Sequence, residues 1–323
     1  MLAPVEKKAV TLRVSLTDRC QLRCIYCKPE KAVKSCSHDD ILSFDEIMEF
    51  VRFLQRQYGL SKVHLTGGDP LNRAGIADLI AMLSDAGVAD IALTTNAQLL
   101  GRHVDALHKA GLKRINISLD SLNPDTFKHM SRGGELSRTL EGIDAALECG
   151  IQPVKLNTVV LKTINEHEVL DIARFSLARN CQVRFLELMP IGVSSEYFKE
   201  WFVPSSAVMK TLEMNYEFHQ KHAKTLSSSR NYEVKSDSGA CGTIGFISPS
   251  TAPFCSGCRR LRLSSDGRLL GCLAQNMGLN LRTITHGDSC LPSAMLDAVD
   301  SALKIKRKKQ KFDTDMAMVS IGG

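Results

Sequence analysis

Six short runs of apolar and β-branched residues alternate with amphipathic stretches along the first 190 residues. They predict strands at 11–16, 62–66, 91–95, 114–119, 154–161 and 183–188. Between the first two strands, the pattern predicts a helix that Ser43 and Glu46 cap at its start and that Gly59 ends. Such alternation is typical of parallel strands joined by right-handed crossovers, so we expect an α/β fold with either an incomplete barrel or a doubly wound sheet.

Polar residues on the predicted strands favour the barrel. Lys155 and Asn157 share one face of the fifth strand by period-two alternation. His64 and Thr66 do the same on the second strand. A closed eight-stranded barrel fills its interior with branched apolar side chains, whereas an open one can hold a wet cavity. We therefore predict an incomplete TIM-like (β/α)6 barrel, with a solvent-facing edge strand as the alternative explanation for these residues.

After the sixth strand the alternation stops. Residues 192–240 are polar and look irregular, residues 241–290 are rich in Gly, Cys and Arg, and a helix is expected near 291–308. We therefore divide the chain into a partial barrel, 1–190, and a smaller C-terminal region, 191–323.

Composition indicates a soluble protein that is not exported and works in the cytoplasm. The apolar fraction is 44%, no run approaches a membrane span of about 20 apolar residues, and the N-terminus lacks a signal-peptide pattern. The 11 cysteines then indicate metal ligands and buried thiols rather than disulfides. The net charge of +6 includes a basic run at 304–311 without aromatic residues, which favours a solvated helix end over a nucleic-acid surface.

Three cysteines, Cys20, Cys24 and Cys27, follow the first strand in the segment TDRCQLRCIYCKP. Three thiolates on one loop can hold three irons of a four-iron cluster and leave the fourth iron open for another ligand. Structural zinc is the alternative, but such sites use four protein ligands, and the nearest histidine, His38, lies outside the loop.

The CxxxCxYC pattern resembles the radical S-adenosylmethionine (SAM) superfamily. The resemblance implies a [4Fe-4S] cluster whose open iron binds SAM and supplies an electron that cleaves SAM to a 5′-deoxyadenosyl radical. The segment Thr66–Pro70, TGGDP, is similar to the GGEP element of that superfamily, whose backbone holds the amino group of SAM. Glycines suit this task because they expose backbone groups to a close ligand.

A second cysteine set lies in FCSGCRRLRLSSDGRLLGCL and consists of Cys255, Cys258 and Cys272. It predicts either a second three-thiolate cluster or a zinc site completed by His286 or Cys290. Arg260 and Arg262 share one face of the strand expected beside it. Guanidinium groups bind phosphate oxygens well, so the arginines favour a cluster beside a phosphate ligand.

Together, these motifs resemble the GTP 3′,8-cyclase (MoaA) family of molybdenum-cofactor biosynthesis over nearly the whole chain, including a terminal Gly322-Gly323. The resemblance implies a second [4Fe-4S] cluster that binds the guanine of GTP, a tail that reaches the active site, and a homodimer. It implies SAM contacts at Tyr26, Gly68, Ser118 and Met189. It implies GTP contacts at Arg13, His64, Thr94, Lys155, Arg260 and Arg262.

Four positions depart from the family pattern: His64 replaces an Arg, Asp69 a Glu, Ala97 a Gly, and Lys28 a Met. His64 lacks a permanent charge and is protonated only near or below its ordinary pKa of about 6.5, so we expect either weaker and pH-dependent GTP binding or a different substrate. Asp69 is one methylene shorter and suffices if its role is local. The cysteines outside both sets are predicted to be plain thiols: Cys36, Cys149, Cys181, Cys241 and Cys290.

The resemblance implies an oxygen-sensitive enzyme that uses SAM to convert GTP into 3′,8-cyclo-7,8-dihydro-GTP. Cyclic pyranopterin monophosphate synthase would then consume this product, with no membrane or nucleic-acid partner and an unspecified electron donor. The first alternative is a radical SAM enzyme with an auxiliary cluster and another substrate, such as a peptide. The second is a zinc-ribbon protein that binds nucleic acid, which would contain zinc instead of about eight irons.

Overall fold

The computed structural model describes residues 9–30, 35–221, 227–236, 239–274, 278–282 and 292–305. All six strands expected in the first half are present, each within two residues of its predicted bounds. They are β1 (Val10–Ser15), β2 (Leu60–Thr66), β3 (Ile91–Thr95), β4 (Arg114–Ser118), β5 (Val154–Val160) and β6 (Gln182–Glu187). Neighbours in this series pair in parallel.

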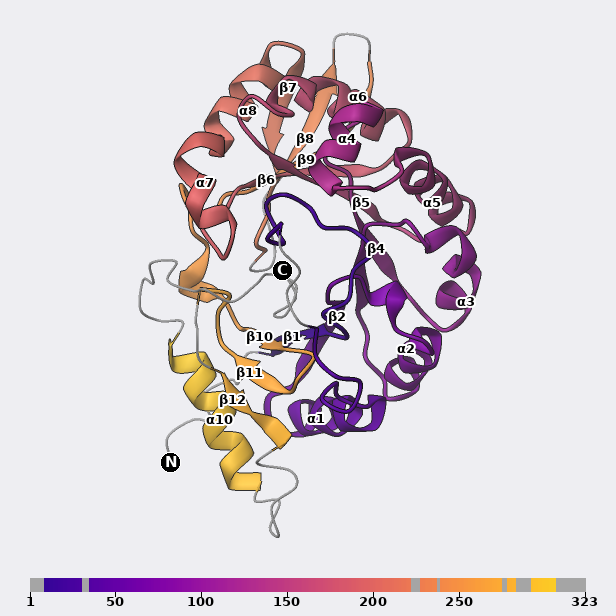
Figure 1. Cartoon of the computed structure of the whole chain (residues 1–323), viewed down its shortest axis with the longest axis vertical. Helices are drawn as coiled ribbons and strands as arrows, with labels where there is room; N and C mark the ends of the chain where they lie inside the picture. The colour runs from indigo at the N-terminus through magenta and orange to yellow at the C-terminus, as the bar shows by residue number, and fades with distance from the viewer. Residues whose placement is uncertain are drawn as a thin grey trace.

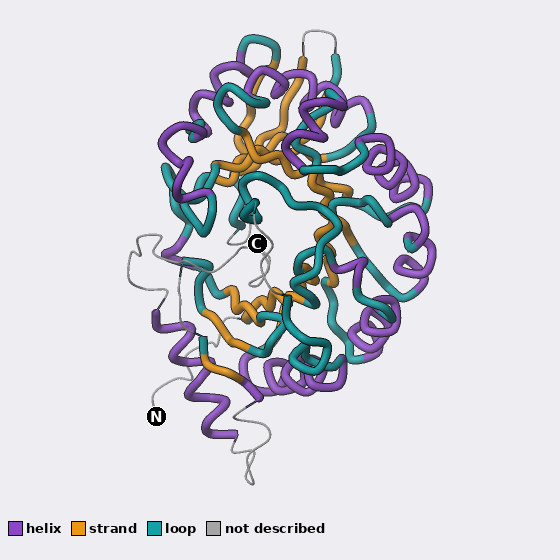
Figure 2. Tube along the Cα trace, viewed as in Figure 1, coloured by secondary structure: helices purple, strands orange, loops and turns teal. Residues whose placement is uncertain are grey.

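Helices follow the strands and lie on the outside of an open ring (Figure 1; Figure 2). They are α1 (Phe44–Tyr58), α2 (Ile76–Asp85), α3 (Val104–Lys109), α4 (Pro124–Ser131), α5 (Leu136–Glu148) and α6 (Val169–Ala178). The predicted start of α1 is confirmed, because Ser43 Oγ accepts a hydrogen bond from the Glu46 amide at 3.1 Å and Glu46 Oε2 accepts one from the Ser43 amide at 2.6 Å. Gly59, at φ 69°, ends the helix.

The expectation that residues 192–240 are irregular is wrong. They contain α7 (Ser194–Trp201), α8 (Ser205–Glu213), β7 (Tyr216–Gln220) and β8 (Arg230–Ser236). Each of these elements is short, and its solvent-facing side is mostly polar. Too few apolar positions are left to reveal a helical or strand periodicity in the sequence. Their apolar positions, such as Val208, Leu212 and Val234, pack in one core cluster with Phe246.

The rest of the described chain adds strands to both edges of the same sheet. They are β9 (Cys241–Ile247), β10 (Arg260–Leu263), β11 (Arg268–Leu270) and β12 (Leu279–Asn280), followed by the helix α10 (Pro292–Ile305). β9 pairs in parallel with β6, and β10 pairs in parallel with β1. The strand order is β12-β11-β10-β1-β2-β3-β4-β5-β6-β9-β8-β7.

This sheet is a barrel that does not close, as predicted. Among the described residues, no strand pairing joins the β7–β9 side to the β10–β12 side. Along β5, Val154 and Leu156 are fully buried under the helices, whereas Lys155 and Asn157 alternate with them and are half-buried. The inner face of the sheet is therefore polar, as the period-two pattern predicted.

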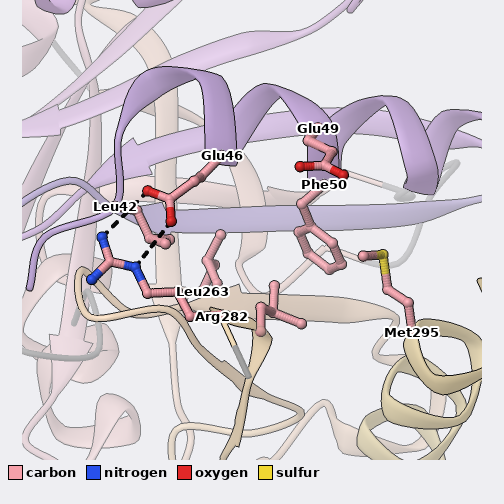
Figure 3. A pocket seen from close by; sticks show the side chains of 8 residues that line it. Leu42, Glu46, Glu49, Phe50, Leu263, Arg282 and Met295 are labelled. Carbon is pink, nitrogen blue, oxygen red and sulfur yellow. Dashed lines mark hydrogen bonds and ion pairs between the residues drawn. The ribbon is translucent and has the colours of Figure 1, made fainter. Parts of the chain in front are cut away.

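Helix α10 packs against α1 (Figure 3). Tyr58 donates a hydrogen bond to Asp300 Oδ1 at 2.8 Å, and Arg282 Nε lies 3.0 Å from Glu46 Oε1. The cavity lined by Phe50 and neighbouring side chains in Figure 3 has a volume of about 10 Å³, enough for at most one water. No helix in the described ranges is long and apolar enough to cross a membrane.

Candidate active site

Polar side chains from seven neighbouring strands occupy the inner face of the open barrel. They are Arg260 and Arg262 on β10, Arg13 on β1, His64 on β2, Thr94 on β3, Asn116 on β4, Lys155 on β5 and Arg184 on β6. Strand register places Arg13 beside both Arg262 and His64. The structure thus brings the six residues predicted to contact GTP to one surface.

Sequence reasoning missed Asn116 and Arg184 on this surface, and also Lys62 on the same face of β2. The signal for Arg184 was present in the sequence, because it alternates with Val183 and Phe185, which are both buried. Lys62 and His64 are separated by one residue on β2, so the same argument applies to them.

Cations dominate the electrostatics of this face. Burial, followed by repulsion from Arg114, lowers the pKa of Arg184 to about 10. Burial and then Arg260 lower the pKa of Arg262 to about 10. For Lys155, burial and then Arg184 lower the pKa to about 8. An anion with several negative oxygens, such as a polyphosphate, would relieve this repulsion and replace lost hydration.

His64 lies in a hydrogen-bonded network on this face. Arg184 Nη2 donates to Asn116 Oδ1 at 2.5 Å, so the amide nitrogen of Asn116 faces His64 Nε2, 3.0 Å away, and Thr94 Oγ1, 3.1 Å away. His64 Nε2 also lies 2.7 Å from Thr94 Oγ1, and none of these partners is a carboxylate that would stabilise an imidazolium. Burial, followed by the charge of Arg13, also lowers the pKa of His64 well below its ordinary value. The structure therefore argues against the expected pH dependence near pH 6.5.

Acidification should instead destabilise the fold through His64. In the unfolded chain this residue takes up a proton below pH about 6.5, whereas in the folded protein it does so only at much lower pH. The unfolded state then binds more protons, so the unfolding free energy should fall by up to about 1.4 kcal/mol per pH unit below that value. His64→Gln should remove this part of the slope in urea unfolding between pH 7.5 and 5.5.

The matched control is His108→Gln, because His108 is exposed in the last turn of α3. It should leave the pH dependence of the unfolding free energy as it is in the unmodified protein. Equal slopes for the unmodified protein and His64→Gln would contradict a buried neutral histidine at this position.

The first cysteine loop lies at the carboxyl end of β1 and is held against the end of α4. The Arg23 amide donates to Ser131 O at 3.0 Å, and the Ile25 amide donates to Met130 O at 2.9 Å. Within the loop, the Cys27 amide donates to Cys24 O at 2.9 Å and forms a tight turn.

The three thiols of this loop suit an iron–sulfur cluster. None of them is in a disulfide, and burial, then nearby negative groups, raise their pKa values, to about 11 for Cys20 and about 12 for Cys27. Burial, then Asp120, Cys27 and Cys20, raise the pKa of Cys24, so the thiols interact electrostatically. The described residues contain no three ligands gathered around a single metal ion. A four-iron cluster differs, because each thiolate binds a separate iron. Each iron–sulfur bond then compensates for the cost of deprotonating a buried thiol.

The loop after β2 packs tightly against this cysteine loop. A Cβ atom on Gly68 would lie 2.2 Å from the Arg19 carbonyl oxygen, so only glycine fits there. Asp69 is 1% exposed and accepts hydrogen bonds from the Leu71 amide at 3.0 Å and Thr95 Oγ1 at 2.8 Å. Its Oδ2 also accepts from the Asn96 amide at 2.8 Å. The short side chain of Asp69 thus reaches donors in its own loop and in the loop after β3, which supports the hypothesis that an Asp suffices here.

Replacing Asp69 with Ala should destabilise the protein by about 3 kcal/mol or more. The change leaves three buried donors without their acceptor, and each costs about 1–3 kcal/mol. Denaturant unfolding of the apoprotein measures the effect. The control, Asp85→Ala, removes an exposed carboxylate at the end of α2 and should change the unfolding free energy by less than about 0.5 kcal/mol. A similar small effect for both variants would contradict the role of Asp69.

The residues predicted to contact SAM lie at the carboxyl ends of the strands, on the same rim as the first cysteine loop. Tyr26 is in that loop, and its hydroxyl donates to Asp120 Oδ2 at 2.6 Å. Gly68 follows β2, Ser118 ends β4, and Met189 comes two residues after β6. Sequence reasoning missed Asp120, which directly follows the strand end at Ser118 and Leu119.

Asn157 is a further candidate on this face. Its Oδ1 atom is buried without a hydrogen-bond partner among the described residues. Register places Asn157 opposite both Ser118 and Arg184, between the two predicted ligand sites. A buried acceptor of this kind suits a donor group on a bound molecule.

The second cysteine set lies next to the cationic face. Cys255 and Cys258 flank a turn before β10, where the Cys258 amide donates to Cys255 O at 3.1 Å, and Cys272 follows β11. Burial lowers the pKa of Arg262, whereas Cys272 and then Cys258 raise it. These two thiols are therefore close to the guanidinium group.

Several predictions fall on residues that the structure does not describe. His286 and Cys290, the possible fourth zinc ligands, are among them, as are Gly322 and Gly323. The other cysteines outside both sets have free thiols: Cys36, Cys149, Cys181 and Cys241.

Comparison with known proteins identifies the family. Residues 14–176 match the radical SAM superfamily, and residues 181–312 match Molybdenum Cofactor Synthesis C. A GTP 3′,8-cyclase of Alkaliphilus metalliredigens (strain QYMF) is 40% identical over 319 residues, 97% of each chain. The chain belongs to the GTP 3′,8-cyclase family of radical SAM enzymes. Another member, from Petrotoga mobilis (strain DSM 10674 / SJ95), is 43% identical over 272 residues, 84% of this chain and 83% of that protein.

Solved structures of more distant proteins share the fold of this family member. Streptococcus suis SuiB bound to S-adenosylmethionine aligns with a TM-score of 0.61 at 14% identity, over 94% of this chain and 66% of SuiB. SuiB bound to its precursor peptide SuiA aligns with a TM-score of 0.57 at 13% identity, over 97% of this chain and 76% of that one. Similarity at this level of identity shows the fold alone, so it does not favour the peptide alternative.

Proposed function

We propose that this chain converts GTP into (8S)-3′,8-cyclo-7,8-dihydroguanosine 5′-triphosphate with SAM as cosubstrate. The observation that carries the proposal is the placement of Arg13, Arg184 and Arg262 on one inner face, beside the second cysteine set and below the rim that holds the first. A peptide substrate gives no reason for so many buried cations. A nucleoside triphosphate does, because its phosphates carry several negative oxygens.

Two [4Fe-4S] clusters belong to the proposal, one on each cysteine set: Cys20, Cys24 and Cys27, and Cys255, Cys258 and Cys272. When bound, a cluster on the first set would supply the electron for the reductive cleavage of SAM, the chemistry that would start the cyclisation of GTP. The chain itself positions the reactants. The Gly68 backbone, Ser118 and Met189 would bind SAM, and Asp120 holds the Tyr26 ring in the first loop.

On the substrate side, the cations would bind the triphosphate. A hydrogen bond to a charged group contributes about 1.5–3 kcal/mol, so Arg13, Arg260, Arg262 and Lys155 together can supply most of the affinity. The family resemblance did not imply a role for Arg184. We add it because its guanidinium lies on the same face, where it donates to Asn116. His64 and Thr94 would contribute neutral hydrogen-bonding groups, because burial and then Arg13 lower the pKa of His64 well below its ordinary value.

The two regions of the chain would have separate tasks. Residues 1–190 would carry the SAM chemistry and residues 191–323 the second cluster and the Gly-Gly tail. The product would pass to cyclic pyranopterin monophosphate synthase. We further propose a homodimer in the cytoplasm, where thiols stay reduced, with no membrane or nucleic-acid partner. Family resemblance supports the dimer, and the first cysteine set, in which none of the three thiols forms a disulfide, supports the compartment.

An anaerobic assay tests the proposed function. The reconstituted protein, incubated with SAM, GTP and dithionite, should form 5′-deoxyadenosine and a cyclised nucleotide, and it should contain about eight irons per chain. Formation of 5′-deoxyadenosine without consumption of GTP would contradict the substrate but keep the radical chemistry. Zinc in place of iron would support a ribbon protein instead.

A further inference from the structure

Asn96, in the loop after β3, contacts a cysteine of the first set. Its Nδ2 atom lies 3.5 Å from Cys20 Sγ, and the residue is 8% exposed. Neither the family resemblance nor the expected SAM and GTP contacts assign a role to this side chain.

Two hydrogen bonds determine which amide atom of Asn96 faces the sulfur. Asn96 Oδ1 accepts from Gln21 Nε2 at 2.9 Å and from the Gln98 amide at 3.0 Å. The Gln98 amide can only donate, so the acceptor beside it must be the oxygen of Asn96. The nitrogen of Asn96 is therefore the atom that faces Cys20.

The backbone of Asn96 is held as firmly as its side chain. Asp69 Oδ2 accepts from the Asn96 amide at 2.8 Å, while Oδ1 of the same carboxylate accepts from the Leu71 amide at 3.0 Å. Asp69 thereby connects the TGGDP loop to Asn96, and Asn96 connects it to Cys20. The short Asp side chain at position 69 is part of this chain of contacts.

An N–H donor at a cluster thiolate affects the electron affinity of the cluster. The reduced cluster carries one more negative charge than the oxidised cluster, so a donor to sulfur stabilises the reduced form more and raises the reduction potential. Cys20 Sγ accepts from Asn96 Nδ2 and also from the Leu22 amide at 3.4 Å. Only proline would remove the backbone donor, and it would also restrict the backbone, whereas an ordinary substitution removes the side-chain donor.

We propose that Asn96 is a positioning residue that donates a hydrogen bond to the Cys20 thiolate and raises the reduction potential of the first cluster. The proposal rests on the proposed function, since it requires the four-iron cluster on the first cysteine set. Through Asp69, it also links the loop expected to hold SAM to the cluster that SAM binds.

Asn96→Asp is the first test. The carboxylate keeps an oxygen for Gln21 and Gln98, but it replaces the N–H donor with an oxygen next to Cys20 Sγ. In an EPR-monitored redox titration of the full two-cluster protein, we follow the signal that SAM addition perturbs. At a fixed potential, the ratio of reduced to oxidised cluster should fall at least tenfold, equivalent to about 59 mV for one electron. Iron content should stay at the level of the unmodified protein.

Asn96→Ala is the second variant, because it removes the side-chain donor without adding charge or a hydroxyl donor. Its potential should shift in the same direction by a smaller amount. The matched control is Gln98→Glu, the same amide-to-carboxylate change on the same loop. Gln98 Nε2 contacts Glu135 O and Thr139 Oγ1 instead of a cysteine. It should change the reduced-to-oxidised ratio less than twofold.

The possible outcomes separate this inference from the proposed function. Iron-loaded Asn96 variants that titrate like the unmodified protein would overturn the inference alone. So would a Gln98→Glu shift as large as that of Asn96→Asp, because the effect would then come from net charge. An unmodified protein that binds no four-iron cluster after reconstitution would overturn the proposed function, and this inference with it.

Discussion

Cys24→Ser should abolish SAM cleavage, whereas Cys272→Ser should abolish only the cyclisation of GTP. Each change should lower the iron content from about eight to about four per chain, because the two residues belong to different cysteine sets. Cys24 lies in the loop that holds Tyr26, whereas Cys272 follows β11 and lies close to Arg262. Iron analysis and chromatography of 5′-deoxyadenosine and nucleotides after anaerobic incubation measure all three quantities.

The control for both variants is Cys149→Ser. Cys149 follows α5 on the outer side of the barrel and contacts Asp105 at 3.5 Å, so its replacement should leave iron content and both reactions at the level of the unmodified protein. If Cys272→Ser kept eight irons or a full rate of GTP cyclisation, a second cluster on that set would be excluded. If it removed SAM cleavage as well, the two cysteine sets would not act separately.

Arg184→Met should weaken GTP binding about 10- to 150-fold, with little loss of stability in the apoprotein. The lost interaction with a phosphate is worth about 1.5–3 kcal/mol. In the apoprotein, the same guanidinium is buried and repelled by Arg114 and Arg260, so its removal relieves a cost while one hydrogen bond to Asn116 is lost. Calorimetric GTP titration gives the affinity, and urea unfolding should show a loss of no more than about 1 kcal/mol.

Arg179→Met provides the comparison for this prediction. Arg179 forms a surface ion pair with Asp144 at 3.1 Å, beyond the end of α6. Its replacement should change neither GTP affinity nor stability by more than about 1 kcal/mol. If Arg184→Met destabilised the apoprotein severely and left the affinity for GTP unchanged, Arg184 would be a structural residue and the cationic face would not be the triphosphate site.

The first half of the fold was predictable because its elements are locally determined. β-branched runs define β1–β6, and the capping box at Ser43 and Glu46 defines the start of α1. Such signals depend on residues a few positions apart. The second half was not predictable in the same way. Nothing local to β9 or β10 says that one pairs with β6 and the other with β1, because those pairings join residues far apart in the chain.

The same distinction applies to the candidate site, where local patterns predicted some features and strand pairing determined the others. Cysteine spacing predicted both thiol sets, and period-two alternation placed His64 and Lys155 on the inner face. The sequence could not show that His64 is neutral, because its charge depends on burial and nearby cations, and its contacts depend on how Arg184 orients Asn116 across the one intervening strand, β5. These contacts join strands β2, β4 and β6.

By itself, the sequence determined the strand–helix alternation, the two cysteine sets and the residues that carry the family resemblance. Only the tertiary structure decided which cations share a surface, and that the amide of Asn96 faces Cys20. Spacing along the chain specifies local turns and the alternation of faces. Charge state and hydrogen-bond direction instead depend on neighbours that strand register brings together, and in this protein the parallel pairing of β10, β1 and β2 brings Arg262, Arg13 and His64 side by side.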